Sequence, residues 1–124
     1  RVEVLTPANG DHPTVQWAAR AHYWQVLEHG VRIFERPGPF DHSKLMLIDG
    51  QWCCLGSANW DARSLRLNFE FNVEVYDTAL STRLESLFDA ARDASNEISA
   101  MALRARPLAI RLRDGVARLF NPIL

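Results

Sequence analysis

The chain has 124 residues, 48% of them hydrophobic, and a formal net charge of −1. This length allows at most one domain with a modest core. Residues 1–103 carry nine Lys and Arg and fourteen Asp and Glu, and this acidic body counts against nucleic acid as a partner, because nucleic acid favours a basic surface. No apolar run approaches the ~20 residues of a membrane span. The sequence begins at Arg1 rather than at a methionine, and a strand pattern starts at once, so we expect it to be part of a longer protein.

The first forty residues are predicted to form a strand, a helix and a second strand. Residues 2–5 make the first strand. Apolar residues then recur at helical spacing over residues 15–29, with Asp11 as the candidate N-cap and Gly30 as the stop signal. Residues 31–34 make the second strand, which leads through a loop rich in Pro and Gly into the stretch that carries the chemistry.

The stretch from His42 to Asn59 is predicted to be a hairpin that opens into a loop. Residues 45–48 and 52–55 are two apolar runs, and Asp49-Gly50 between them is a strong signal for a tight hairpin turn. A Gly-Ser-Ala-Asn sequence follows the second run. The two ends of the hairpin therefore carry most of the polar side chains of this stretch.

The remaining residues are predicted to form a strand and two helices. Residues 69–76 alternate apolar and polar side chains, which is typical of a half-buried strand. Residues 78–104 carry an apolar stripe at helical spacing and are predicted to be one long helix. Together these elements predict an α/β fold in which a mixed sheet is flanked by helices. We expect two parts, a catalytic half at residues 1–104 and a basic amphipathic tail at residues 105–124.

The tail combines positive charge with an apolar helical face. Residues 104–124 carry five arginines and one aspartate. The apolar residues on one helical face are Leu108, Leu112, Val116, Leu119, Phe120 and Ile123. Such a helix suits the surface of an anionic membrane, and it equally suits packing against a part of the protein outside this chain.

Polar side chains of the hairpin stretch suit chemistry at a phosphate ester. His42 and Lys44 are two residues apart, so they project from the same face of an extended chain. A histidine can attack phosphorus, while the lysine ammonium, the Ser57 hydroxyl and the Asn59 amide can hold phosphoryl oxygens. Asp49 has the opposite parity and would lie roughly 23 Å from the histidine on a continuous strand, which indicates a turn residue. Cys and His residues show no metal-ligand spacing, so neither a metal nor a cofactor is predicted.

The motif residues match the pattern H-x-K-x(4)-D-x(6)-G-S-x-N at all six fixed positions, and this stretch resembles the HKD signature of the phospholipase D superfamily. The sequences N-W-D-x-R-S at 59–64 and L-N-F-E at 67–70 resemble bacterial cardiolipin synthases, in particular their C-terminal half. The resemblance implies a phospholipase D-like fold that forms one half of a two-motif enzyme. It also implies a set of catalytic residues, which are His42, Lys44, Asp49 and Glu70. The residues implied to bind the substrate phosphate are Ser57 and Asn59.

Glu70 has two interpretations. It is either a solvent-facing carboxylate at the start of a strand or, as the resemblance implies, the acceptor of the Nδ1 proton of His42, which fixes the tautomer of the ring.

The activity implied by the resemblance is that of a phosphatidyltransferase of the cardiolipin synthase type, acting through a phosphohistidine intermediate. A phospholipid such as phosphatidylglycerol would donate its phosphatidyl group to the hydroxyl of a second lipid. The second histidine would come from a second HKD half in the same chain or in a homodimer. The protein would lie at a bacterial cell membrane, peripherally or anchored by a segment outside this chain.

Two other functions fit the same residues. With water as the acceptor, the site would be that of a phospholipase D-type phosphodiesterase or nuclease. Without its partner half, the chain would be an inactive lipid-binding or scaffolding half-domain.

Overall fold

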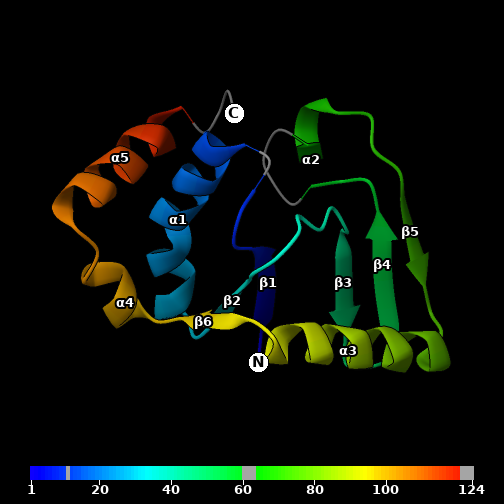
Figure 1. Cartoon of the computed structure of the whole chain (residues 1–124). Helices are drawn as coiled ribbons and strands as arrows, with labels where there is room; N and C mark the ends of the chain where they lie inside the picture. Colours follow the sequence, from blue (N-terminus) through cyan, green and yellow to red (C-terminus); the bar gives the residue numbers. More distant parts are fainter. Residues whose placement is uncertain (11, 60–63, 121–124) are drawn as a thin grey trace. The chain divides into compact units, whose positions relative to one another are not determined.

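The structure is a computed structural model that describes residues 1–10, 12–59 and 64–120, apart from the side chain of Leu65 (Figure 1). The chain divides into two compact units, each of which is described by itself. The terminal unit comprises Arg1–Phe40 and Ala94–Leu124, and the motif unit comprises Asp41–Asp93. The predicted α/β class is confirmed, although the strands form two small sheets of three rather than one sheet.

The terminal unit contains a mixed sheet with the strand order β1-β2-β6. Strands β1 (Glu3–Pro7) and β2 (Arg32–Arg36) are parallel, and helix α1 (Pro13–Glu28) makes the crossover between them. Strand β6 (Asn96–Ile98) runs antiparallel to β2 on the other side. As the central strand, β2 buries residues 33–35.

Helix α1 begins without a side-chain cap among the described residues. Pro13 occupies the first turn, where its missing N–H costs nothing, and His12 precedes it with an extended backbone and no side-chain cap hydrogen bond. Asp11, the predicted N-cap, lies outside the described residues. The proline therefore marks the start of this helix.

Helix α5 (Leu108–Leu119) packs against α1, and the short helix α4 (Ala100–Arg104) also contacts α1. Ala18 of α1 and Ala117 of α5 are both buried, and such small side chains allow two helices to approach closely. The Arg113 guanidinium also lies 4.2 Å from the ring centroid of Trp17, a cation–π contact between the same two helices.

The predicted apolar face of α5 does not make this contact. Leu108, Leu112, Val116 and Leu119 are all exposed, whereas the buried residues of the helix are Asp114 and Ala117. The helix therefore packs on α1 through a different face. Both predicted partners of the apolar face, a membrane or a further part of the protein, stay predictions, as does the division of the chain at residue 104.

The prediction of one helix over residues 78–104 is wrong. The structure has helix α3 (Thr78–Asp93), then β6, and only then α4. Ser95 and Asn96 are weak helix formers, and the following residues gain backbone hydrogen bonds by pairing with β2. A bidentate ion pair reinforces this edge, because Arg32 Nε and Nη2 donate to the two carboxylate oxygens of Glu97 at 2.9 and 2.8 Å.

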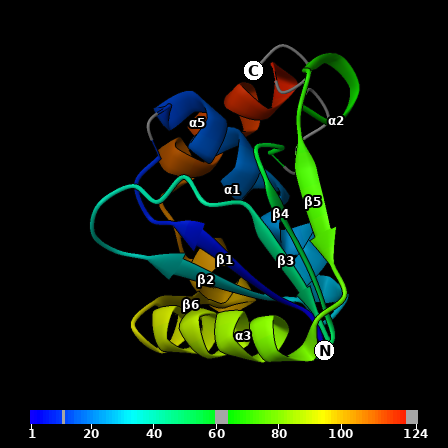
Figure 2. The same ribbon diagram turned by 90° about the vertical axis from the view of Figure 1, so that its right-hand side faces the viewer.

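The motif unit contains an antiparallel sheet with the strand order β3-β4-β5. Strands β3 (Leu45–Ile48) and β4 (Trp52–Gly56) form the predicted hairpin. Asp49 and Gly50 form the turn as predicted, both with positive φ, 50° and 62°, but Ile48 pairs with Trp52, so Gln51 is a third loop residue. Helix α3 packs on β3 and β4 and lies across the end of the sheet that carries this turn (Figures 1 and 2).

The third strand of this sheet is shorter than predicted. Strand β5 covers Asn72–Val75, whereas the alternation predicted a strand over residues 69–76. Phe69 is fully exposed at 107% and Phe71 is 74% exposed, so the first half of the predicted strand buries no apolar side chain. The core of the motif unit is accordingly small and includes Cys53, Cys54 and Ala58.

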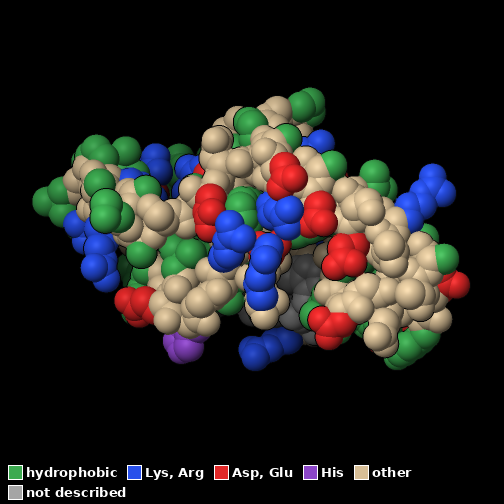
Figure 3. Space-filling view, turned by 90° about the horizontal axis from the view of Figure 1, so that it is seen from below, with side chains coloured by type: hydrophobic (Ala, Val, Ile, Leu, Met, Phe, Trp, Pro, Cys, Tyr) green, Lys and Arg blue, Asp and Glu red, His purple; other side chains and the backbone are tan. Residues whose placement is uncertain are grey.

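Surface charges are largely balanced by local ion pairs. Arg32 pairs with Glu3 and Glu97 in the terminal unit, and Arg92 pairs with Asp89 and Asp93 in the motif unit. In the view of Figure 3, acidic side chains border a group of basic side chains near the centre.

Candidate active site

The segment ahead of β3 holds the first two motif residues. The Asp41 carboxylate accepts the backbone N–H of Ser43 at 2.9 Å, which makes a tight local turn around His42. Lys44 Nζ lies 2.6 Å from the His42 Nδ1 atom and 2.6 Å from the His42 carbonyl oxygen. The predicted convergence of the histidine and the lysine is therefore confirmed, although both precede the strand rather than lie on it.

The contact between the lysine and the ring constrains the histidine chemically. An ammonium group can only donate hydrogen bonds, so Nδ1 of His42 accepts one from Lys44 and carries no proton in this arrangement. A neutral ring then carries its proton on Nε2. Attack on phosphorus by Nε2 requires the other neutral tautomer, and protonation of a leaving group requires the imidazolium, so in both roles Nδ1 must exchange this contact for a proton.

The hairpin brings the second part of the motif to the same end of the sheet. The Gly56 N–H donates to the Lys44 carbonyl oxygen at 3.3 Å, beyond the last paired residues of β3 and β4. The Gly-Ser-Ala-Asn loop therefore starts beside the lysine. The Asp49-Gly50 turn lies at the opposite end of β3, as the parity of the strand predicted.

Ser57 is fastened to the segment that precedes β5. Its N–H donates to the Phe71 carbonyl oxygen at 3.0 Å, and its Oγ accepts the Phe71 N–H at 2.9 Å. One residue further on, the Ala58 N–H donates to the Asn72 side-chain oxygen at 3.3 Å. These bonds hold the loop so that Ala58 is buried and its neighbours Ser57 and Asn59 are exposed.

Gly56 is required by a close approach inside the chain. It pairs with Asn72 of β5, and a Cβ at this position would lie closer to the Phe71 carbonyl oxygen and to Asn72 than real Cβ atoms do. The approach that the structure shows is that of the neighbouring strand.

Glu70 directly precedes the segment that holds Ser57. In the described part of the chain its carboxylate accepts a hydrogen bond from the Asn68 side chain at 3.4 Å, and Asn68 also donates to Ser64 Oγ at 3.2 Å. Glu70 is half-buried rather than fully exposed. The bond from His42 Nδ1 to Glu70 is not made in this arrangement, and the orienting role stays a prediction.

Two residues that position the site were not predicted. Asp41 directly precedes the histidine, and an aspartate two residues before an N–H is a recognisable turn signal. Asn72 was assigned to a regular strand, and nothing in its local sequence indicates that its side chain would hold Ala58. Asp61 and Arg63, which carry part of the family resemblance, lie outside the described residues.

Comparison with known proteins agrees with the motif. A family model described as "Cardiolipin synthase, PLD-like domain" matches residues 1–92. The chain belongs to the cardiolipin synthase family of phospholipase D-like domains. Cardiolipin synthase 1 of Staphylococcus epidermidis is 37% identical to this family member over 123 residues, covering 99% of this chain and 25% of the relative. The cardiolipin synthases of Oceanobacillus iheyensis and Geobacillus sp. are 35% and 37% identical over the same number of residues, covering 99% of this chain and 26% and 24% of their own lengths.

The chain thus spans about a quarter of the length of these curated cardiolipin synthases. Within residues 1–10, 12–59 and 64–120, no helix is both long and apolar enough to cross a membrane. The same residues contain no group of three or more His, Cys, Asp or Glu side chains arranged to hold a metal ion.

Proposed function

We propose that this chain is one HKD half of a phosphatidyltransferase of the cardiolipin synthase type. The observation that carries the proposal is the 2.6 Å contact between Lys44 Nζ and His42 Nδ1, at the end of a hairpin that also presents the Gly-Ser loop, in a chain of this family. In the proposed reaction a phospholipid gives its phosphatidyl group to a histidine and releases an alcohol. The hydroxyl of a second lipid then takes the group from the histidine.

Each half-reaction needs two histidines. In the first, one histidine forms a bond to phosphorus through a ring nitrogen, and the other gives a proton to the oxygen of the departing alcohol. In the second, the proton donor, now neutral, removes the proton of the lipid hydroxyl as its oxygen attacks phosphorus and the phosphorus–nitrogen bond breaks. His42 supplies one of these rings, and a second HKD half, in the same chain or in a homodimer, supplies the other.

The contacts of His42 favour neither role over the other. Lys44 donates to Nδ1, which leaves the proton of the neutral ring on Nε2. The nucleophile needs a proton on Nδ1 of a neutral ring, and the proton donor needs protons on both ring nitrogens. Either role therefore requires an acceptor for the Nδ1 proton, and Glu70 is the candidate for that task. We propose that Glu70 and Lys44 compete for Nδ1 and that substrate phosphate draws the ammonium away from the ring.

The phosphoryl oxygens are proposed to be held by Lys44, Ser57 and Asn59. The Lys44 ammonium donates to Nδ1 and to the carbonyl oxygen of His42, and its third N–H can donate to a phosphoryl oxygen. The Ser57 hydroxyl accepts from Phe71 N–H, and its own proton makes only a long contact of 3.4 Å with the Phe71 carbonyl oxygen. Rotation of that hydroxyl would give a phosphoryl oxygen a better hydrogen bond than the one it has. Asp49 completes the motif, and its position in the turn favours a structural role over a catalytic one.

The proposed donor is phosphatidylglycerol, the proposed acceptor is a second lipid alcohol, and the proposed location is a bacterial cell membrane. The chain would reach the membrane peripherally or through a segment that lies outside it. The names of the relatives support the acceptor, since a cardiolipin synthase joins two phospholipids rather than hydrolysing one.

The test is a His42→Ala substitution in the complete enzyme. Loss of a positioned acid or base should lower transfer roughly 10²–10⁴-fold, and loss of a nucleophile should lower it further. His22→Ala is the matched control, because that histidine contacts only Gln25 within α1 among its described partners and should leave transfer unchanged. Activity of the His42 variant within a few-fold of the parent would overturn the site.

The acceptor is tested in the same assay. The enzyme should convert labelled phosphatidylglycerol to cardiolipin and free glycerol in the presence of lipid. A product consisting only of phosphatidic acid would instead establish water as the acceptor and a phospholipase D activity.

A further inference from the structure

A second cationic feature lies in the terminal unit, and none of its residues belongs to the HKD motif. Helices α1, α4 and α5 enclose a pocket of about 340 Å³, a size that can hold a small polar ligand. Its charged lining is mainly basic, with five arginines against two carboxylates, a formal excess of three positive charges. The arginines are Arg20, Arg104, Arg106, Arg111 and Arg118, and the carboxylates are Glu28 and Asp114.

Two of these arginines have fixed roles in the fold. Arg20 makes a bidentate pair with Glu35 at 2.8 and 2.7 Å, and this hydrogen bonding raises the pKa of its guanidinium. Arg106 donates to Asp114 at 2.7 Å, and the aspartate, which is only 1% exposed, also accepts from Arg113. The single carboxylate that α5 brings to the pocket is therefore sequestered and neutralised.

The other three arginines are available to a ligand. Arg104 lies 3.9 Å from Glu28 with both side chains largely in solvent, which is worth little as an ion pair. Arg111 and Arg118 make no ion pair with the residues that the structure describes. They are seven residues apart, so they lie on one face of α5, and Gly115 between them leaves the space open.

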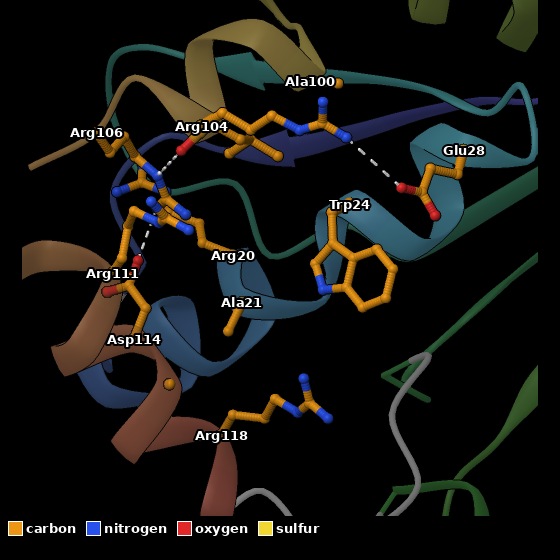
Figure 4. Close-up of a pocket in the computed structure, with 12 residues that line it drawn as sticks. Arg20, Ala21, Trp24, Glu28, Ala100, Arg104, Arg106, Arg111, Asp114 and Arg118 are labelled. Carbon is orange, nitrogen blue, oxygen red and sulfur yellow. Dashed lines mark hydrogen bonds and ion pairs between the residues drawn. The ribbon is translucent and has the colours of Figure 1, made fainter. Parts of the chain in front are cut away.

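The middle of the pocket presents an aromatic ring. Figure 4 shows the indole of Trp24 between the guanidinium groups of Arg104 and Arg118. Trp24 is 46% exposed although it lines a pocket, so a ligand could cover it. An indole with guanidinium groups beside it suits a ligand that has both an anionic head and an apolar part.

Helix α5 adds an apolar surface beside the arginines. Leu108, Leu112 and Leu119 are exposed by 60% or more, and Leu108 lies one turn from Arg111 on the helix surface. An arginine row that borders an exposed leucine stripe is the pattern of a helix at the surface of an anionic bilayer. Free phosphate would use only the arginines and would leave this stripe without a role.

We propose that the pocket between α1, α4 and α5 binds anionic phospholipid headgroups, with Arg104, Arg111 and Arg118 as the residues that contact their phosphates and the leucine stripe of α5 against the acyl region. This site is additional to the HKD motif and does not depend on its chemistry. It would hold the terminal unit at a bilayer of the lipid class that the proposed reaction consumes.

The test measures partition of the 124-residue chain onto phosphatidylglycerol vesicles, with phosphatidylcholine vesicles as the uncharged comparison. An arginine at an anionic leaflet contributes about fivefold to the partition coefficient, so Arg111→Gln with Arg118→Gln should weaken binding about 25-fold. Arg83→Gln removes an equally exposed arginine from α3 and should have little effect. His42→Ala should bind like the parent, which separates this proposal from the catalytic one.

The outcomes are distinct. Equal losses for Arg83→Gln and for Arg111→Gln would indicate non-specific charge attraction and overturn the site. An unchanged partition coefficient in the double variant would also overturn it, provided that circular dichroism shows the parent helix content. Titration with inorganic phosphate, followed through the Trp24 indole N–H signal, tests the ligand source. Saturation by phosphate without vesicle binding would overturn the lipid assignment.

Discussion

Replacing Gly56 by alanine should unfold the motif end of the hairpin. The new Cβ would meet Asn72 Cα at 2.7 Å and would meet the Phe71 carbonyl oxygen and the Asn72 side-chain oxygen at still shorter range. Overpacking of this kind typically costs about 1–3 kcal/mol. Two of the opposing atoms belong to the backbone and cannot rotate away, so relief requires β4 and β5 to separate.

The cost of that separation can be worked out from the bonds that cross it. Ser57 and Phe71 exchange hydrogen bonds at 3.0 and 2.9 Å, and each contributes roughly 0.5–1.5 kcal/mol net. The total loss should therefore be about 1–3 kcal/mol, a large part of the about 5–15 kcal/mol by which domains are stable. The Gly-Ser loop would lose its position at the same time, so transfer by the complete enzyme should fall together with stability.

Gly115→Ala is the matched control for this experiment. The same methyl group is added in the middle of α5, where nothing lies within 4 Å, and alanine should stabilise the helix by about 0.5–1 kcal/mol. The two substitutions should thus move the urea midpoint in opposite directions. A Gly56→Ala variant that unfolds within about 0.5 kcal/mol of the parent would refute the close-approach reasoning.

Six further substitutions test the site and the fold. Lys44→Arg should retain the fold and lose most turnover in the complete enzyme, because a planar guanidinium cannot take the place of a compact ammonium 2.6 Å from the ring, and full activity would remove the lysine from the site. Asp49→Ala should lower stability by about 1 kcal/mol, because alanine tolerates the positive φ at this position less well than aspartate or asparagine. Asp49→Asn should preserve both stability and turnover. A stable but inactive Asp49→Asn variant would establish a catalytic role for the carboxylate. Ser81→Ala should raise the melting temperature slightly, because the Ser81 hydroxyl is fully buried and has no hydrogen-bond partner among the described residues. A lower melting temperature for this variant would contradict the prediction. Asp114→Ala should lower the free energy of unfolding by about 2–3 kcal/mol, which is below the full penalty for a broken buried ion pair because its arginine partners reach solvent. Asp93→Ala removes a carboxylate from an exposed ion pair and should cost under about 0.5 kcal/mol. Similar losses of stability in the two variants would count against the anchoring role of Asp114.

The hairpin could be predicted from sequence because its determinants are local. Two apolar runs and an Asp-Gly pair indicate the strands and the turn within a dozen residues. The register does not follow from that pair alone, because a two-residue loop would pair Ile48 with Gln51, whereas the structure pairs Ile48 with Trp52. The approach of Lys44 to His42 follows from their spacing of two. These features need no information from the rest of the chain.

The errors come from contacts with distant parts of the chain. The apolar stripe over residues 78–104 is compatible with a helix throughout, and only pairing with β2 shows that residues 96–98 form a strand. Likewise the alternation at residues 69–76 does not reveal that Phe69 would be exposed. The face by which α5 packs is set by Asp114 and its arginine partners, a polar cluster that apolar periodicity cannot detect.

The pairing of β2 with β6 has a consequence for the order of folding. It joins Glu35 to Asn96, so the intervening loop contains the whole motif unit. Closing a flexible loop of that length costs about 2 kcal/mol more conformational entropy than closing one of a few residues. A motif unit that is already folded would reduce the flexible part to the short connections on either side of it. Strand β6 should therefore dock late, after the HKD hairpin and α3 have formed, and amide protons of β6 should gain protection from exchange after those of β4 in a refolding experiment.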